Sequence, residues 1–392
     1  MIPKLLSDIV EADIQALRDG GVQEGQTLEF KRELPGTRDE DKREFLADAS
    51  SFANTDGGDI IYGVAEEQGV ITDIVGASSP DFDAEILRLE SLIRDGISPR
   101  MGITSRIVPC AAGKLLVLRI EKSWIRPHRV IFRGHDKFYG RTSAGKFALD
   151  VSQLRTAFLH SATLSEQIST FRVDRIIDIA NDRAPVALVK APTVVLHLVP
   201  LNALSEQPEF DVAELYRNPS LHQPLSASGW SQRMTFDGIL LHTPVDGEGK
   251  VSSYTQFYRN GILEAVATSL LETRQVPGQR LIPHVVFESS ALIYLQRCLQ
   301  SLERLGVRPP VSVMLTILNV RGLRMAMGAF SDDGGNEIRE ETLILPGALA
   351  PNFSASPSSI LRPMFDRMWN ACGLLRSSNF DEAGNWAHRC GF

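Results

Sequence analysis

Two residues two positions apart, Glu29 and Lys31, carry the pattern with the clearest chemistry in this sequence. In a β-strand, residues i and i+2 project to the same side, so Glu29 and Lys31 lie together while Leu28 and Phe30 face the other side. A carboxylate can hold a divalent cation, and a lysine can orient an attacking water or stabilise the charge that develops on phosphorus. The pair therefore fits metal-dependent cleavage of a phosphodiester.

A hard divalent cation such as Mg²⁺ or Mn²⁺ requires more than one carboxylate. Glu24 comes just before the predicted strand, and Glu66 follows the apolar run at 60–64. If these two strands are neighbours, Glu24, Glu29 and Glu66 reach the same edge of a sheet. The alternative is a solvated strand face, because Glu-x-Lys is a common combination and most such pairs are surface ion pairs of little energy.

Residues 100–155 form a basic stretch within an acidic chain. They contain twelve lysines and arginines against three acids, whereas the whole chain of 392 residues has a formal net charge of −7. Aromatic residues such as Trp124 and Tyr139 are interleaved, and cations with aromatic faces suit a looped or single-stranded nucleic acid. The alternative is a solvated strand surface with the aromatic rings turned inward. The predicted nucleic-acid-binding residues are Lys122, Arg126, His128, Arg129, Arg133, Lys137, Arg141 and Lys146.

A frame of strands and helices must bring these residues together, and apolar periodicity predicts one. The expected helices are 7–18 (capped by Ser7), 39–54, 82–95, 151–159, 164–182, part of 281–305, and 361–374. The expected strands are 27–33, 60–64, 103–108, 115–120, 137–141, 193–198, 236–242, 254–258, 311–318 and 323–330. We therefore expect an α+β fold throughout, with a mixed sheet in the N-terminal part. We expect the tail at 376–392 to pack loosely.

The length and composition indicate more than one domain. We expect a nucleic-acid-binding domain at 1–160, a helical connector at 161–184 and a second α+β domain of unknown role at 185–392. No run of about twenty apolar residues is present, and the apolar start is too short for a secretory signal. The four cysteines lack zinc-ligand spacing, so we interpret them as free thiols of a cytoplasmic protein.

Two segments resemble the Schlafen/AlbA-like domain family. Glu24–Lys31 resembles that family's E-x4-E-F-K opening, and the run 49–64 is similar to its A-F-A-N-T-x-G-G-x-[ILV]-x-x-G-V signature. Arg126-Pro127-His128 and Tyr139–Ser143 resemble later elements of the family. The resemblance covers about residues 10–160 and none of the remainder.

The resemblance implies a function and a set of site residues. In nuclease-active Schlafens, two glutamates of the opening and an acid after the G-V strand form a three-carboxylate metal site. By position these are Glu24, Glu29 and Glu66, with Lys31 assisting, although the family often has an aspartate where Glu66 stands. The family core encloses nucleic acid between two lobes, and this chain has one by motif, so a homodimer is expected.

Three functions follow, and the sequence leaves them open. The first is an endonuclease that uses Mg²⁺ or Mn²⁺ on structured, tRNA-like RNA or single-stranded nucleic acid, in phage defence by family analogy. The second is a non-catalytic DNA-binding transcriptional regulator. The third is a protein-interaction scaffold. An ATPase is not expected, because the chain has no G-x-x-x-x-G-K-[ST] loop.

Overall fold

The computed structural model of the chain describes residues 1–204, 208–217, 223–271, 280–326 and 335–388. It divides into two compact units, Met1–Thr163 and Leu164–Phe392. Both units combine helices with β-sheet, which confirms the expected α+β class.

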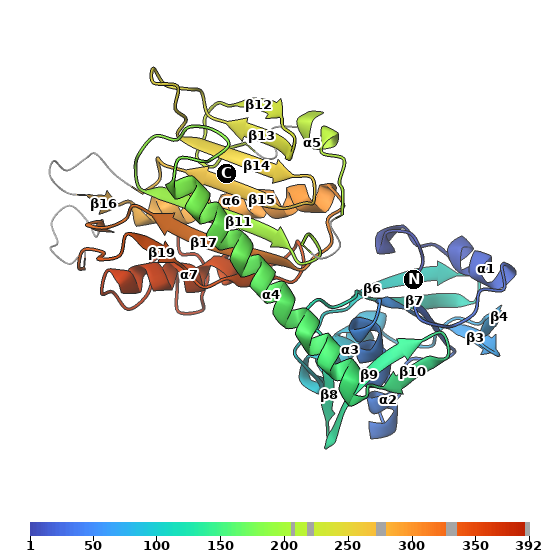
Figure 1. Ribbon diagram of the computed structural model, residues 1–392. Coiled ribbons are helices and arrows are strands. Elements are labelled where there is room, and N and C mark those ends of the chain that lie inside the picture. The colour runs from blue at the N-terminus through green and yellow to red at the C-terminus, as the bar shows by residue number, and fades with distance from the viewer. Residues whose placement is uncertain (205–207, 218–222, 272–279, 327–334, 389–392) are drawn as a thin grey trace. The chain divides into compact units, whose positions relative to one another are not determined.

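The first unit contains a four-stranded sheet in the order β1-β2-β7-β6. Strands β6 and β7 of this sheet are labelled in Figure 1. Strands β1 and β2 are parallel, and the chain crosses from one to the other through helix α2. The other neighbours are antiparallel. The elements are β1 (Leu28–Lys31), α2 (Asp39–Asn54), β2 (Gly58–Tyr62), β6 (Thr104–Cys110) and β7 (Gly113–Ile120).

A second, antiparallel sheet in this unit has the order β10-β9-β8-β5. Its strands are β5 (Ile97–Ser98), β8 (Arg129–Phe132), β9 (His135–Thr142) and β10 (Gly145–Ala148). A separate hairpin joins β3 (Val64–Glu67) to β4 (Val70–Ile74). The remaining elements are η1 (Leu6–Asp8), α1 (Glu11–Asp19) and α3 (Phe82–Gly96).

Strand β2 is buried on both faces because its side chains alternate between two apolar clusters. Ile60 packs with Phe45, Phe52 and other residues of one cluster. Its neighbour Ile61 packs with Phe30 in the other. The continuous apolar run at 60–64 is therefore the signature of a central strand.

Helix α4 is continuous over 30 residues, Val151–Ala180. The two helices expected at 151–159 and 164–182 are thus one helix, and the division between the two units falls inside it. Helix α1 also differs from the expectation. Ser7 lies in the short helix η1. Helix α1 begins after Val10, whose backbone N–H donates a hydrogen bond to the Asp13 side chain.

The second unit is built on an antiparallel sheet in the order β12-β13-β14-β15-β11-β17-β19, with β20 also paired to β17. Its strands are β11 (Thr193–Pro200), β12 (Ser231–Met234), β13 (Gly238–His242), β14 (Ser253–Tyr258), β15 (Leu263–Ala267), β17 (Val311–Leu318), β19 (Thr342–Ile344) and β20 (Ala348–Ala350). The other elements are α5 (Ala213–Arg217), β16 (Leu281–Ile282), α6 (His284–Arg304), β18 (Arg324–Met325) and α7 (Pro357–Ala371).

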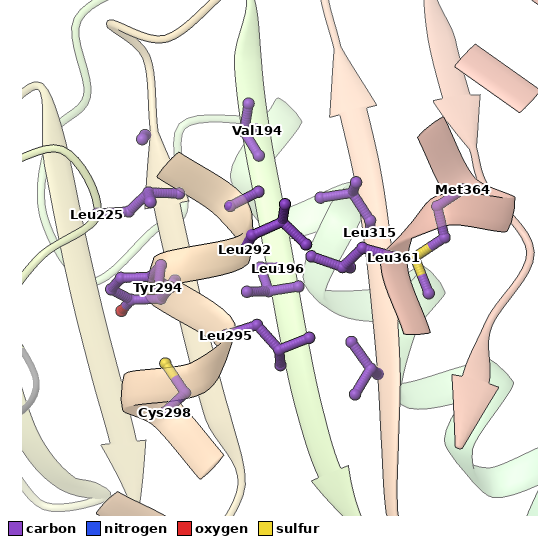
Figure 2. Close-up of a cluster of buried hydrophobic side chains, with 14 of the residues drawn as sticks. Val194, Leu196, Leu225, Leu292, Tyr294, Leu295, Cys298, Leu315, Leu361 and Met364 are labelled. Atoms are coloured by element: carbon purple, nitrogen blue, oxygen red, sulfur yellow. The ribbon is translucent and has the colours of Figure 1, made fainter. Parts of the chain in front are cut away.

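Helices α6 and α7 pack on one face of this sheet (Figure 2). Leu292 and Leu295 of α6 lie against Leu196 of β11, and Leu361 of α7 lies close to Leu315 of β17 (Figure 2). The opposite face packs against Ile176 and other residues of α4. The sheet is therefore covered by helices on both sides.

Residues 376–388 of the C-terminal tail are tied into the second unit, contrary to the loose packing expected from its composition, and 389–392 lie outside the described residues. Ser377 and Asn379 are buried, and both donate hydrogen bonds to the buried carboxylate of Glu288, at 2.8 and 2.9 Å. Trp369 Nε1 donates a third, at 2.7 Å. Polar residues at the chain end thus satisfy a buried acid instead of facing solvent.

In the described part of the chain, no helix combines the length and apolar character needed to cross a bilayer. Cys110, Cys298 and Cys372 are free thiols, and Cys390 lies outside the described residues.

Candidate functional site

Glu29 of β1 is buried between two cations. Its Oε1 lies 2.6 Å from Lys31 Nζ, and its Oε2 accepts a hydrogen bond from Arg141 Nη2. Leu28 and Phe30 are buried in an apolar cluster on the other side of the strand. The alternation of the strand therefore places Glu29 and Lys31 together, and the ion pair uses one oxygen of the carboxylate.

Arg141 of β9 reaches Glu29 from the second sheet. Its side chain is 2% exposed, donates to the carbonyl oxygens of Gly25 and Leu28, and lies over the Phe52 ring at 4.3 Å. Burial lowers the pKa of Arg141 to about 10, against the opposing charge of Glu24. Arg141 is therefore still a cation at neutral pH, held where it compensates a buried acid.

Asp48 of α2 is a further buried acid at this place. It lies 2.9 Å from Lys146 Nζ and 3.8 Å from Arg141 Nη1. Burial raises the pKa of Asp48, while Lys146 and Lys31 oppose the shift. We call Glu29, Asp48, Arg141 and Lys146 the charge cluster. Sequence reasoning missed Asp48, although a charged residue on the apolar face of α2, between Phe45 and Phe52, was a usable signal.

Glu24 and Glu66 both hold the turn between β3 and β4. Glu24 N donates to Gly69 O at 2.6 Å, and Gly69 N donates to Glu66 Oε2 at 2.8 Å. The other end of Glu24 accepts from Phe30 N at 2.5 Å. Burial raises the pKa of Glu24, and the charge of Glu66 adds to this shift. Glu66 itself is exposed.

Several of the predicted site residues line one pocket of about 390 Å³. Its lining includes the predicted residues Glu24, Glu29, Arg141 and Lys146, and also Asp48. Glu66 does not line it. Lys31 lines a neighbouring pocket of about 310 Å³, which shares Glu44 and Asp48 with the first.

The acids do not fit a divalent metal as they are placed. Among the residues that the structure describes, no group of three His, Cys, Asp or Glu side chains is arranged to hold a metal ion. Both oxygens of Glu29 are engaged by cations, and Glu66 is turned to Gly69 N. Among the described residues, Glu24, Glu29 and Glu66 are therefore not gathered as one ligand set, and Glu29 is paired with Lys31 and Arg141.

The predicted nucleic-acid-binding residues differ in exposure: His128 and Arg141 are buried, Arg133 and Lys137 are exposed, and the others, Lys122, Arg126, Arg129 and Lys146, are intermediate. His128 is fully buried, with Nδ1 at 2.8 Å from Pro99 O and Nε2 at 2.6 Å from Ser123 Oγ. Arg126 donates to the carbonyls of Asn54 and Thr55 at the end of α2. With the charge cluster residues Arg141 and Lys146, these side chains hold the fold together. His128 and Arg141 are buried, whereas the sequence predicted that they lie at the surface.

The more exposed of these residues lie on the β8–β9 hairpin. Arg133 and Lys137 are exposed, and the Arg129 side chain is 44% exposed. Arg129 pairs with Asp136, Arg133 with Asp39 and Lys122 with Asp56. Ion pairs at such exposed positions are weak, so phosphate groups can compete for these cations.

The Asn54 side chain ties α2 to the hairpin. It donates to His128 O at 2.9 Å and Tyr139 O at 2.8 Å, and accepts from His128 N at 2.6 Å. The glycines that follow have steric roles. A Cβ on Gly58 would clash with the Phe52 ring, and Gly57, at φ +73°, packs against the Lys122 backbone. The 49–64 signature therefore specifies how α2, β2 and the hairpin join.

Residues 24–150 match the sequence model of the family described as Schlafen, AlbA_2. The match confirms the resemblance seen in the motifs. It also indicates a function related to nucleic acids for this Schlafen/AlbA-like domain. No curated protein matches the chain.

Two solved structures are similar to parts of the chain. The DIP2311 protein from Corynebacterium diphtheriae is 18% identical with a TM-score of 0.26, and the alignment covers 36% of this chain and 26% of DIP2311. The N-terminal domain of a putative ATP-dependent DNA helicase RecG-related protein from Nitrosomonas europaea is 22% identical with a TM-score of 0.22. That alignment covers 27% of this chain and 71% of the domain.

Proposed function

We propose that the Schlafen/AlbA-like domain binds nucleic acid through the phosphate backbone, using the exposed cations of the β8–β9 hairpin. The observation that carries the proposal is the exposure of Arg129, Arg133 and Lys137 on one hairpin of a domain that matches this family. Their side chains can exchange weak surface ion pairs for phosphates, and such contacts position a nucleic acid without reading its bases.

Salt-dependent binding tests this proposal. The full chain is titrated against a labelled RNA hairpin and a labelled single-stranded DNA at several salt concentrations. Each phosphate contact contributes about one unit to the slope of log affinity against log salt. Arg133→Gln with Lys137→Gln should weaken binding and reduce this slope by about two. Arg297→Gln removes an exposed cation from the second unit and is the control. If the slope is unchanged in the double variant, the hairpin is not the interface.

A second candidate is the metal-dependent endonuclease. The observation in its favour is that Glu24 and Glu29 line one pocket with Asp48. The endonuclease proposal includes the predicted Mg²⁺ or Mn²⁺ ion, structured RNA as the substrate, and a homodimer. Metal binding at Glu29 would have to compete with the ion pairs to Lys31 and Arg141.

Cleavage assays separate the two candidates. The purified protein is incubated with tRNA and single-stranded DNA in Mn²⁺ or in EDTA, beside Glu29→Ala and the more conservative Glu24→Gln. Cleavage that needs the metal and is lost in both variants supports the endonuclease. Binding without cleavage in all three proteins supports the binding domain alone.

A further inference from the structure

The outer face of the β8–β9 hairpin exposes apolar side chains. Directly opposed residues of an antiparallel pair share a face, and the register pairs Arg129 with Phe138 and Ile131 with Asp136. Ile131 and Phe138 therefore lie on the same face, whereas Val130 points to the core. Ile131 is 40% exposed.

The first turns of α4 add a second aromatic ring to this face. Phe158 meets Phe138 edge-on, with 6.1 Å between the ring centroids and an angle of 78°. The residue Phe158 is 54% exposed, and Leu159 and Val151 are also more than half exposed. An edge-on aromatic pair of this kind can fasten the start of α4 to the hairpin. This contact alone does not explain why Phe158 remains more than half exposed.

The charges around this face are mainly positive. Arg155 is exposed one turn before Phe158, and Arg129 stands directly opposite Phe138. Arg133 follows at the hairpin turn. The nearby acids are Asp136, which pairs with Arg129 at 3.0 Å, and Asp150, which accepts from the Gln153 backbone N–H. The exposed Phe158 and the half-buried Phe138 thus lie near several cations, an arrangement that suits a polyanion with flat apolar faces.

We propose that Phe138 and Phe158 form a stacking site for unpaired bases, with the adjacent phosphates against Arg129 and Arg155. The inference rests on the proposed nucleic-acid binding and names its substrate class, a single strand. Every base has a face that can stack on an aromatic ring, so the site does not select a sequence. In a duplex these base faces are covered by neighbouring base pairs, so a duplex contacts only the cations.

Substitution of Phe158 tests the site, because the exposed ring can be changed with little risk to the fold. Labelled single-stranded and duplex DNA of equal length are titrated with the full chain. Phe158→Ala should weaken single-strand binding by about 5-fold to 100-fold, the effect of losing one stacked base, and leave duplex binding unchanged. Phe158→Trp should restore single-strand affinity, and its fluorescence should be quenched when the strand is added. Leu159→Ala, equally exposed but not aromatic, is the control.

The outcomes separate this site from the proposed function. If the hairpin charge variants lose binding but Phe158→Ala does not, the hairpin binds nucleic acid and the stacking site is wrong. Equal loss of single-strand and duplex binding in Phe158→Ala also overturns the stacking site. A change in self-association of Phe158→Ala, without a change in single-strand affinity, would assign the face to a protein partner. If the wild type binds neither nucleic acid, both proposals fail.

Discussion

Arg141 of β9 and Glu29 of β1 form a buried ion pair that joins the two sheets of the first unit. Taking a carboxylate and a guanidinium out of water is costly, and the pair is tolerated because other groups share the charges. Lys31 contacts the second oxygen of Glu29, and Asp48 lies near the second terminal nitrogen of Arg141. Removal of one member therefore leaves an uncompensated charge inside the domain.

Arg141→Met should destabilise the chain by about 3 kcal/mol, the lower end of the range for breaking a buried pair, because Lys31 still contacts Glu29. Urea unfolding of the full chain measures the loss. Arg155→Met removes an exposed arginine from the same unit and should change stability little. Adding Glu29→Gln to Arg141→Met should recover part of the loss, since the uncompensated charge is then gone. Equal stability of Arg141→Met and Arg155→Met would show that the pair does not hold the sheets together.

The period of a strand was enough to predict that Glu29 and Lys31 lie together, and the family motifs located the domain. The partners of Glu29 were not predictable in this way. Arg141 comes from a second sheet whose packing depends on side chains far apart in the sequence. A basic residue in a basic stretch was expected at the surface, yet burial against Phe52 and Glu29 places Arg141 inside.

His128 shows a related limit of the sequence. Its position among arginines and aromatic residues predicted exposure. In the interior, however, Pro99 O accepts a hydrogen bond from Nδ1, and Nε2 is hydrogen-bonded to Ser123 Oγ. Burial lowers the pKa of His128, while the Pro99 hydrogen bond opposes the shift. Such partners depend on tertiary packing, which cannot be predicted from residue type and spacing. The prediction of a loosely packed polar tail was wrong for the same reason, because the buried carboxylate of Glu288 accepts hydrogen bonds from it.

Mn²⁺ should not stabilise the protein specifically, because cations of the chain already engage Glu29. A ligand that binds only the folded state raises the melting temperature, and the stabilisation grows with the logarithm of its concentration relative to Kd. Thermal unfolding with Mn²⁺ or EDTA should therefore give similar shifts for the wild type and Glu29→Gln. A Mn²⁺-dependent increase present in the wild type and lost in Glu29→Gln and Glu24→Gln would show a metal site. It would then favour the endonuclease.

Asn54→Ala should destabilise the first unit, because it leaves two backbone carbonyls and the His128 N–H without their partner. Each unsatisfied buried group costs about 1–3 kcal/mol, so a loss of about 2–4 kcal/mol is expected where water reaches some of them. Urea unfolding is again the measurement. Asn181→Ala is the control, because that side chain donates only to Ile177 O at an exposed helix end. A similar stability of both variants would argue that Asn54 serves a ligand and not the fold.

In the second unit, Glu264 is fully buried and should make stability depend on acid pH. Arg175 contacts it through two hydrogen bonds, at 2.8 and 2.9 Å, and Tyr254 and His197 provide two more. Burial alone would raise the pKa of Glu264, but the Arg175 and His197 hydrogen bonds outweigh it and lower the pKa from 4.5 to about 2. A depressed carboxyl pKa means that the folded state binds the proton less readily than the unfolded chain. The stabilisation is therefore complete above the unfolded pKa of 4.5 and is lost as pH falls toward about 2.

Glu264→Gln removes this dependence and gives the test. At neutral pH it should destabilise the chain by about 3–5 kcal/mol, because Arg175 is left buried without its acid. The gap in unfolding free energy between wild type and Glu264→Gln should narrow between about pH 5 and about pH 3, since only the wild type carries the titrating carboxylate. Tyr254→Phe keeps the charge pair and should cost only about 1 kcal/mol, a milder variant if Glu264→Gln does not fold. A gap that stays constant over this pH range would show that Glu264 is not the ionised partner of Arg175.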